Sequence, residues 1–232
     1  SMASIHNLSD GSVVNTFSVV AGGYYQSTAI YGTKFLSSYI NQLYVYDIPT
    51  GNLDATVVLP GANTSGQNHT SQLNRTEIVG DLAYISNWNY DRESFPTNSN
   101  LSHGAIYVID LTTNTVLTTI TNPNQLYTQM AGTFAVSDEY VVATRYRESA
   151  KDGTSYDNSI SIDMEVFSVP HYSHLGSLTM KPGTANPTME THLQIADGQL
   201  FASTGEGTYR DIEIYDLATL SHNYTLMSGG AT

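Results

Sequence analysis

The sequence predicts an all-β fold built from repeated four-stranded antiparallel units, and three observations support this prediction. The first is composition: 232 residues include 25 Ser, 28 Thr, 17 Asn and 17 Tyr, but only 12% are charged, against about 25% in an average soluble domain. The second is a strand–turn–strand pattern that occurs five times along the chain. The third is another hairpin, which precedes four of these five copies.

The repeated hairpin is clearest from Leu43 to Val57 and from Ile106 to Ile120, which match residue for residue. Looser copies cover Asn7–Phe17, Met164–Leu178 and Ile212–Leu226. A polar residue ends the first strand of each copy: Asn7, Asp47, Asp110, Ser168 and Asp216. A hydroxyl residue follows nine positions later: Thr16, Thr56, Thr119, Ser177 and Thr225. We expect turns near Gly11, Gly51 and Asn114, where a positive φ is tolerated.

The second hairpin has its predicted turns at Gly32-Thr33, Gly80-Asp81, Ser137-Asp138 and Asp197-Gly198. Its predicted strand pairs are Tyr25–Tyr31 with Phe35–Tyr39, Thr76–Val79 with Leu82–Ser86, Thr133–Val136 with Tyr140–Thr144, and His192–Ala196 with Leu200–Ser203. Two hairpins make a four-stranded antiparallel repeat of about 40–60 residues, which is typical of a β-propeller blade. The sequence therefore predicts one propeller domain, or a fragment of one, over residues 3–228, with four full blades and an N-terminal half blade.

The half blade needs two further strands to be complete, and three explanations stay open. The chain can be part of a longer propeller, it can pair the half blade with another subunit, or the predicted strands of the first blade can be assigned wrongly. Ser1 and Met2 are interpreted as a cloning remnant.

Long segments are expected between second and third strands and between blades. All of them are expected at one end of the fold, where binding surfaces are usually found. They are 89–104, 146–158, 205–211, 60–74 and 181–191.

The hairpin Ile106–Ile120 is similar to the repeats of YVTN-type bacterial surface propellers. The larger unit resembles an FG-GAP repeat, as in the integrin α-subunit propeller, with Gly132–Thr144 as the opening hairpin and Tyr107–Asp110 as the later strand. This resemblance implies an extracellular binding or adhesion module. The repeats lack the family's alternating calcium ligands, so no cofactor is expected.

Charge and residue usage exclude several classes of function. With a net charge of −13 and no basic stripe, the chain does not fit a nucleic-acid partner. No apolar run is long enough to span a membrane as a helix, and no signal peptide is visible. The absence of Cys excludes disulfides, thiolate catalysis and cysteine zinc sites. The composition favours an extracellular, cell-surface or virion-surface protein.

The candidate ligand site consists of aromatic and Arg residues that follow the second strand of three blades. These residues are Trp88, Tyr90, Arg92, Arg145, Tyr146, Arg147, Tyr209 and Arg210. Aromatic rings stack on sugars, and the guanidinium group binds carboxylates through two hydrogen bonds. The alternative interpretation is that each Arg pairs with a neighbouring acidic residue and only anchors its loop.

Metal and enzyme signatures are weak or absent. Asp152, Ser155 and Asp157 form the one loop that calcium would tolerate, without the required alternation, so we expect a solvated loop. His171 and His174 are expected to be ordinary turn residues, since no third ligand lies nearby. No nucleophile elbow, phosphate loop or dinucleotide fingerprint is present. No catalysis is expected, although paired carboxylates could still meet across the axis.

Six Asn-x-Ser/Thr sequons would be glycan sites if the protein passes through a secretory pathway: Asn7, Asn63, Asn68, Asn74, Asn100 and Asn223. Together these features predict a non-catalytic recognition or adhesion module for a glycan or protein. One alternative is an assembly module that oligomerises through its open edge. A less favoured alternative is a glycan-cleaving hydrolase or lyase.

Overall fold

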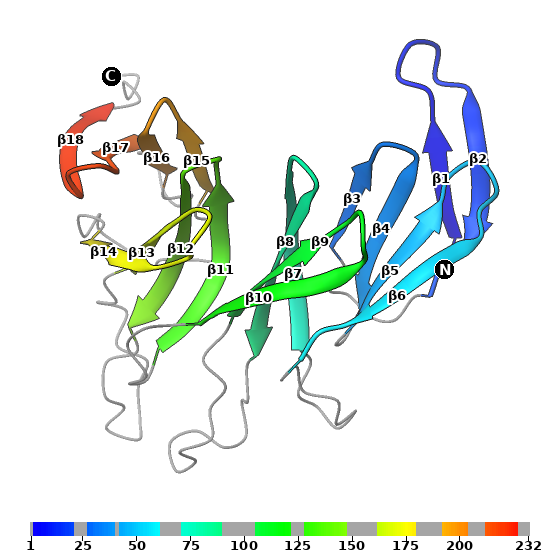
Figure 1. Ribbon diagram of the computed structural model, residues 1–232. Coiled ribbons are helices and arrows are strands. Elements are labelled where there is room, and N and C mark those ends of the chain that lie inside the picture. Colours follow the sequence, from blue (N-terminus) through cyan, green and yellow to red (C-terminus); the bar gives the residue numbers. More distant parts are fainter. Residues whose placement is uncertain are drawn as a thin grey trace, which may run out of the picture. The chain divides into compact units, whose positions relative to one another are not determined.

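The computed structural model contains eighteen β-strands in four four-stranded sheets and one two-stranded sheet (Figure 1). The structure describes residues 2–20, 27–39, 42–60, 71–89, 105–121, 128–147, 162–179, 192–203 and 212–226. Each four-stranded sheet is formed by consecutive strands in sequence order, and the pairing is antiparallel wherever its register is given. These sheets are the predicted blades.

The half blade consists of β1 (Met2–His6) and β2 (Val13–Ser18). Blade 1 consists of β3 (Thr28–Tyr31), β4 (Lys34–Tyr39), β5 (Gln42–Asp47) and β6 (Leu53–Val58). Blade 2 consists of β7 (Ser71–Val79), β8 (Leu82–Asn89), β9 (Ala105–Asp110) and β10 (Thr115–Thr121). The predicted half blade is therefore confirmed as a two-stranded sheet.

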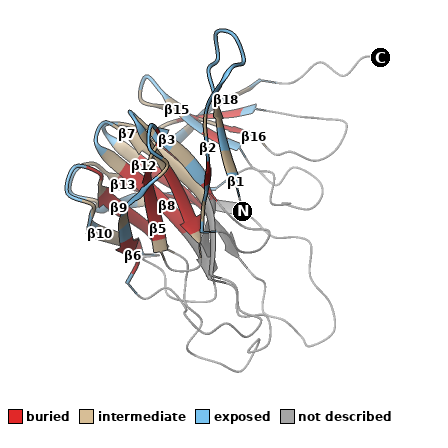
Figure 2. Cartoon of the chain, turned by 90° about the vertical axis from the view of Figure 1, so that its right-hand side faces the viewer, coloured by how far each residue is buried: buried red, intermediate tan, exposed pale blue. Residues whose placement is uncertain are grey.

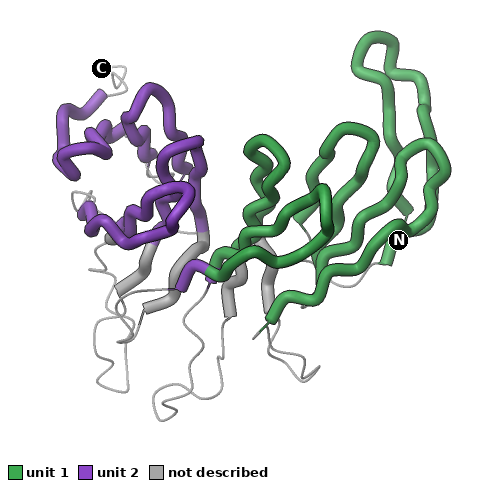
Figure 3. Tube along the Cα trace, viewed as in Figure 1, with its two compact units in different colours: residues 1–90, 106–119 green, residues 91–105, 120–232 purple. Residues whose placement is uncertain are grey.

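Blade 3 consists of β11 (Thr128–Val136), β12 (Tyr140–Arg147), β13 (Ile162–Ser168) and β14 (His174–Thr179). Blade 4 consists of β15 (His192–Ala196), β16 (Gln199–Ser203), β17 (Ile212–Asp216) and β18 (Ser221–Leu226). The chain forms two compact units, residues 1–90 with 106–119 and residues 91–105 with 120–232 (Figure 3). Unit 1 holds the half blade, blade 1 and most of blade 2, and unit 2 holds blades 3 and 4.

The third strand of each blade forms the centre of the core. In β5 and β9, four consecutive residues are buried, because these strands have a neighbouring strand on each side and are covered on both faces (Figure 2). The fourth strands β6 and β14 and the half-blade strand β2 share one burial pattern, with a single buried residue each. These residues are Phe17, Val57 and Leu178.

Neighbouring blades pack face to face within each unit. In unit 1, Leu43 and Val57 of blade 1 share a core with Tyr107 and Ile109 of blade 2. In unit 2, Met164 and the rest of one face of blade 3 share a core with the facing residues of blade 4. We call the face of a blade that points to the next blade in sequence its forward face, and the opposite face its rear face.

The turn that joins the third and fourth strands has the same backbone conformation in all five copies. The residue four positions after the aligned polar residue has a positive φ in every repeat: Gly11, Gly51, Asn114, Tyr172 and Leu220. The predicted turns at the first three are confirmed. Tyr172 and Leu220 show that the repeat imposes this conformation even on side chains that rarely adopt it.

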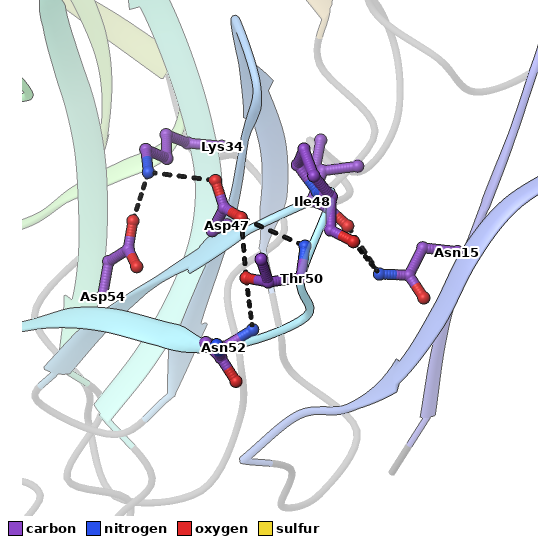
Figure 4. A network of polar contacts seen from close by, with 8 residues as sticks. Asn15, Lys34, Asp47, Ile48, Thr50, Asn52 and Asp54 are labelled. Atoms are coloured by element: carbon purple, nitrogen blue, oxygen red, sulfur yellow. Dashed lines mark hydrogen bonds and ion pairs between the residues drawn. The ribbon is translucent and has the colours of Figure 1, made fainter.

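Three of these turns are stabilised by the Asp that ends the third strand. The Asp47 carboxylate accepts hydrogen bonds from the amide and hydroxyl of Thr50, at 3.1 and 2.7 Å (Figure 4). Asp110 accepts the same pair from Thr112, and Asp216 accepts it from Thr219. Hydrogen bonding to the ionised form lowers the pKa of all three Asp residues.

Acid is expected to weaken the fold through these turns. Because their pKa values are lower in the folded chain, the three carboxylates add stability above the unfolded pKa of about 3.9, and this stability is lost as the pH falls through the folded values. The combined Asp47→Asn, Asp110→Asn and Asp216→Asn variant should show a flatter pH dependence of its urea midpoint between neutral and acidic pH. Parallel pH profiles for the variant and the native chain would contradict this role.

Candidate functional site

Four of the eight predicted ligand-binding residues lie at the ends of second strands. Trp88 lies in β8, where its backbone is opposite Gln72 of β7. Arg145, Tyr146 and Arg147 are the last three residues of β12. The other four, Tyr90, Arg92, Tyr209 and Arg210, lie outside the described residues, as do the Asp152–Asp157 loop and sequons Asn63, Asn68 and Asn100.

The prediction that a loop begins at Tyr146 is wrong, because β12 continues to Arg147. Beyond an irregularity in β11, Tyr146 pairs with Gln129 on one side and with Ile162 on the other. Arg145 is opposite Asp163 in this ladder, which places residues of opposite charge at one cross-strand position. Strands β7 and β8 likewise exceed their predicted lengths, so that Asn74 and Asn89 belong to strands.

Trp88 and Tyr146 occupy equivalent positions of blades 2 and 3. Trp88 comes two residues after Ser86, and Tyr146 comes two residues after Thr144. Ser86 and Thr144 are buried hydroxyl residues at matching positions of the second strands. Trp88 belongs to unit 1 and Arg145–Arg147 belong to unit 2. The structure thus gives Trp88 and Tyr146 matching positions in two blades.

The two ends of each blade differ in the length of their connections. At one end, turns such as Gly32-Thr33 and Asp197-Gly198 join adjacent strands directly. At the other end, the second and third strands are separated by residues 90–104 in blade 2 and 148–161 in blade 3. Trp88 and Arg147 lie at this second end, which we call the long-connection end.

A polar cluster that the sequence prediction missed lies in blade 3. The Glu165 side chain is fully buried, and its Oε2 atom lies 2.7 Å from His174 Nε2 and 2.7 Å from Ser177 Oγ. The His174 ring also packs on Phe167, with ring centroids 5.4 Å apart. His174 is the first residue of β14, so the expectation of an ordinary turn role holds for His171 and not for His174.

Blade 4 repeats this cluster at the same positions. Glu213 Oε2 accepts a hydrogen bond of 2.7 Å from Thr225 Oγ1 and is bonded to His222 Nε2. The His222 ring lies 5.3 Å from that of Tyr215. In both clusters one carboxylate oxygen bonds to the hydroxyl group and to the imidazole ring. The clusters hold fourth strands onto third strands.

The repeat alignment contained the signal for both clusters. Glu is followed by His nine residues later and by Ser or Thr after three more, in both blades. The equivalent of Glu is Tyr44 in blade 1 and Tyr107 in blade 2, and the equivalent of His is Leu53 or Val116. The Glu and His positions therefore change together, because a buried carboxylate requires a donor opposite it.

Three further features are the sequons, groups that could hold a metal ion and helices that could span a membrane. Asn7 and Asn223, the two sequon residues whose side chains are described, are both exposed. Among the described side chains, no group of three or more His, Cys, Asp or Glu could hold a metal ion. Within the same part of the chain, no helix is long and apolar enough to cross a membrane.

Comparison with solved structures confirms the propeller fold. The chain is similar to the WD40 domain of Neurospora crassa Pan2, with a TM-score of 0.54 and 13% identity over 88% of this chain and 51% of that one. It is also similar to the Dos1 propeller, with a TM-score of 0.58 and 13% identity over 98% of this chain and 53% of that one. The chain thus spans about half the length of these propellers. No family model and no curated protein matches it.

The fold and its structural neighbours define the class of protein: an all-β propeller of four-stranded antiparallel blades. The similarity of fold does not distinguish an FG-GAP repeat from a YVTN repeat.

Proposed function

We propose that the protein is a non-catalytic recognition module that binds a glycan or protein ligand at its long-connection end. The observation that carries this proposal is the position of Trp88 and Arg147 at equivalent strand ends, where the longest connections leave the blades. The ligand class follows from the residue types. An indole ring offers a flat apolar surface to sugar rings, and a guanidinium group offers paired donors to a carboxylate.

A ligand with carboxylate groups would have to bind through local contacts with Arg, because the net negative charge of the chain repels anions at longer range. The net charge is −13, yet Arg145, Arg147 and Arg210 are three of only eight basic residues and are predicted to lie at one end of the fold. Exposed sequons at Asn7 and Asn223, together with the resemblance to YVTN-type surface propellers, support a secreted or surface-displayed protein.

Binding should be measured on an array of sialylated, uronate-containing and neutral glycans, and on cells that display them. Arg147→Ala and Arg210→Ala are each expected to weaken binding to the carboxylate-bearing ligands by roughly tenfold or more, because each removes a charge-assisted hydrogen bond. Trp88→Ala should weaken binding to acidic and neutral sugars alike.

The control is Lys34→Ala, which removes one positive charge at the opposite end of blade 1, beside the Gly32-Thr33 turn. Lys34 bonds to Asp47 at 3.3 Å and to Asp54 in that part of the blade (Figure 4). Binding by this variant should be unchanged. Unaltered binding by the Trp88, Arg147 and Arg210 variants would exclude the proposed site.

A further inference from the structure

The half-blade strand β2 and the fourth strands β6, β14 and β18 each contain one extra residue at the same repeat position. Each strand pairs with the preceding strand in a regular ladder, which then skips a single residue. The skipped residue lies seven positions after the aligned polar residue of its copy. Two residues that face one residue of the partner strand form a β-bulge. The extra residues are Val14, Asp54, Leu175 and Asn223.

The side chain of the extra residue does not explain the bulge. Two aliphatic residues, a carboxylate and an amide occupy this position, and all four residues are exposed. Val14 is 55% exposed and Leu175 is 46% exposed. The shared property is the spacing of nine positions between the aligned polar and hydroxyl residues, which includes the extra residue in every copy. Because the four side chains share no chemistry, this spacing preserves a shape of the backbone.

The bulge interrupts the outer edge of the blade. In the described part of the chain, β6 and β14 are the last strands of their sheets (Figure 1). Beyond the bulge, the regular ladder covers only residues 55–58 of β6 and 176–179 of β14. A bulge bends its strand and increases the local twist, so the backbone groups on its two sides do not form one straight row. Another strand would therefore find only four regular positions along this edge.

The same edges have no other protection against strand pairing. An exposed strand edge is a template for a second chain, and proteins usually protect it with Lys, Pro or an inward-pointing charge. Residues 55–58 are Ala-Thr-Val-Val and residues 176–179 are Gly-Ser-Leu-Thr, so neither segment contains a charge or a Pro. Uncharged segments of this kind, rich in β-branched and aliphatic residues, favour pairing between chains. The bulge is the protective feature that both edges share.

We propose that the bulge prevents the outer edges of the blades from pairing with the blade edges of a second copy of this chain. The regular spacing of the repeats places the same interruption in blade after blade, whatever residue occupies it. Association through a blade edge is blocked by the backbone, while the ends of the blades stay accessible to a ligand.

Deletion of Leu175 from the whole chain tests this proposal. His174 is opposite Phe167 and Gly176 is opposite Val166, so the deletion leaves both pairs in place and makes the ladder regular. Sedimentation velocity should then show self-association about tenfold or more stronger than that of the native chain, because backbone hydrogen bonds can form along the full edge. The deletion removes an exposed apolar side chain, so added hydrophobic surface would not explain this result.

Leu175→Ser is the matched control, since it removes the same side chain and retains the bulge. It should sediment like the native chain. Deletion of Asp54 repeats the test on β6, with Asp54→Ser as its control because either change removes the contact with Lys34. Hydrogen exchange locates the new contact: the amides of β14 that point away from β13 should become protected in the Leu175 deletion variant as its concentration rises.

Three results would overturn the proposal. The first is that both deletion variants are folded by circular dichroism and sediment like the native chain. The second is that they associate without protection of β6 or β14, because the contact would then lie elsewhere. The third is that both deletions unfold the chain, since the extra residue would then be a requirement of the hairpin itself.

Discussion

Replacement of His174 by Ala is expected to lower the free energy of unfolding by about 1.5–3 kcal/mol, the range for a hydrogen bond to a charged group. The Glu165 side chain is fully buried, and His174 provides a contact of 2.7 Å to its Oε2 atom. Removing the ring takes away a donor to a carboxylate that water does not reach in the folded chain. Urea denaturation at neutral pH measures this loss directly.

His171→Ala is the matched control, because His171 lies in the adjacent turn and is exposed. It should change stability by less than about 0.5 kcal/mol. If His174→Ala has no larger effect than His171→Ala, the cluster does not anchor the fourth strand of blade 3. His222→Ala in blade 4 should have a smaller effect than His174→Ala, because the Glu213 side chain is 12% exposed and the Glu165 side chain is fully buried.

The repeats themselves offer a replacement for the whole cluster. Blade 1 has Tyr44, Leu53 and Thr56 at the positions of Glu165, His174 and Ser177. The triple variant with blade 1 residues removes the buried charge together with its partners, and such replacements are often neutral or stabilising. It should therefore be more stable than His174→Ala alone. A triple variant that is less stable would show that Glu165 has a role that a Tyr side chain cannot fill.

The sequence was sufficient to predict the blades because local interactions determine them. Each hairpin keeps a constant length, and its turn requires a positive φ four residues after the polar residue. The exchange of Tyr44 and Leu53 for Glu165 and His174 was visible in the same alignment. The signal lies in the nine-residue separation of Glu165 and His174 on neighbouring strands, and not in the closeness of His174 to His171 along the chain.

The ends of the long strands could not be predicted in the same way. The pairing of Tyr146 with Gln129 resumes after an irregularity in β11, and no feature of β12 alone indicates that its partner returns to register. The candidate ligand site is less predictable still, because Trp88 and Arg147 come from different blades. Whether such residues act together depends on the arrangement of the blades, which local patterns do not encode. Tyr90, Arg92, Tyr209 and Arg210 remain predictions.

Replacement of Phe17 by Ala is expected to release the half blade from blade 1. The Phe17 ring is 7% exposed and packs 5.6 Å from Tyr46 and 5.9 Å from Phe35. A Cβ atom at Gly51 would lie 2.6 Å from Phe17 Cβ, so β2 and the turn between β5 and β6 are in close contact there. Loss of a buried Phe side chain costs about 3–5 kcal/mol.

The other contacts of the half blade with blade 1 are the packing of Ala3, Ile5 and Val19 against the same cluster and several hydrogen bonds. Asn15 Nδ2 donates a hydrogen bond of 2.6 Å to Ile48 O (Figure 4), and Val20 N donates one of 2.7 Å to the Tyr46 hydroxyl. Without the ring, hydrogen exchange should therefore accelerate at the amides of β1 and β2 and stay unchanged in blades 3 and 4. Val14→Ala is the control on the same strand, since Val14 is 55% exposed. Unchanged exchange in β1 and β2 would show that the half blade does not depend on Phe17.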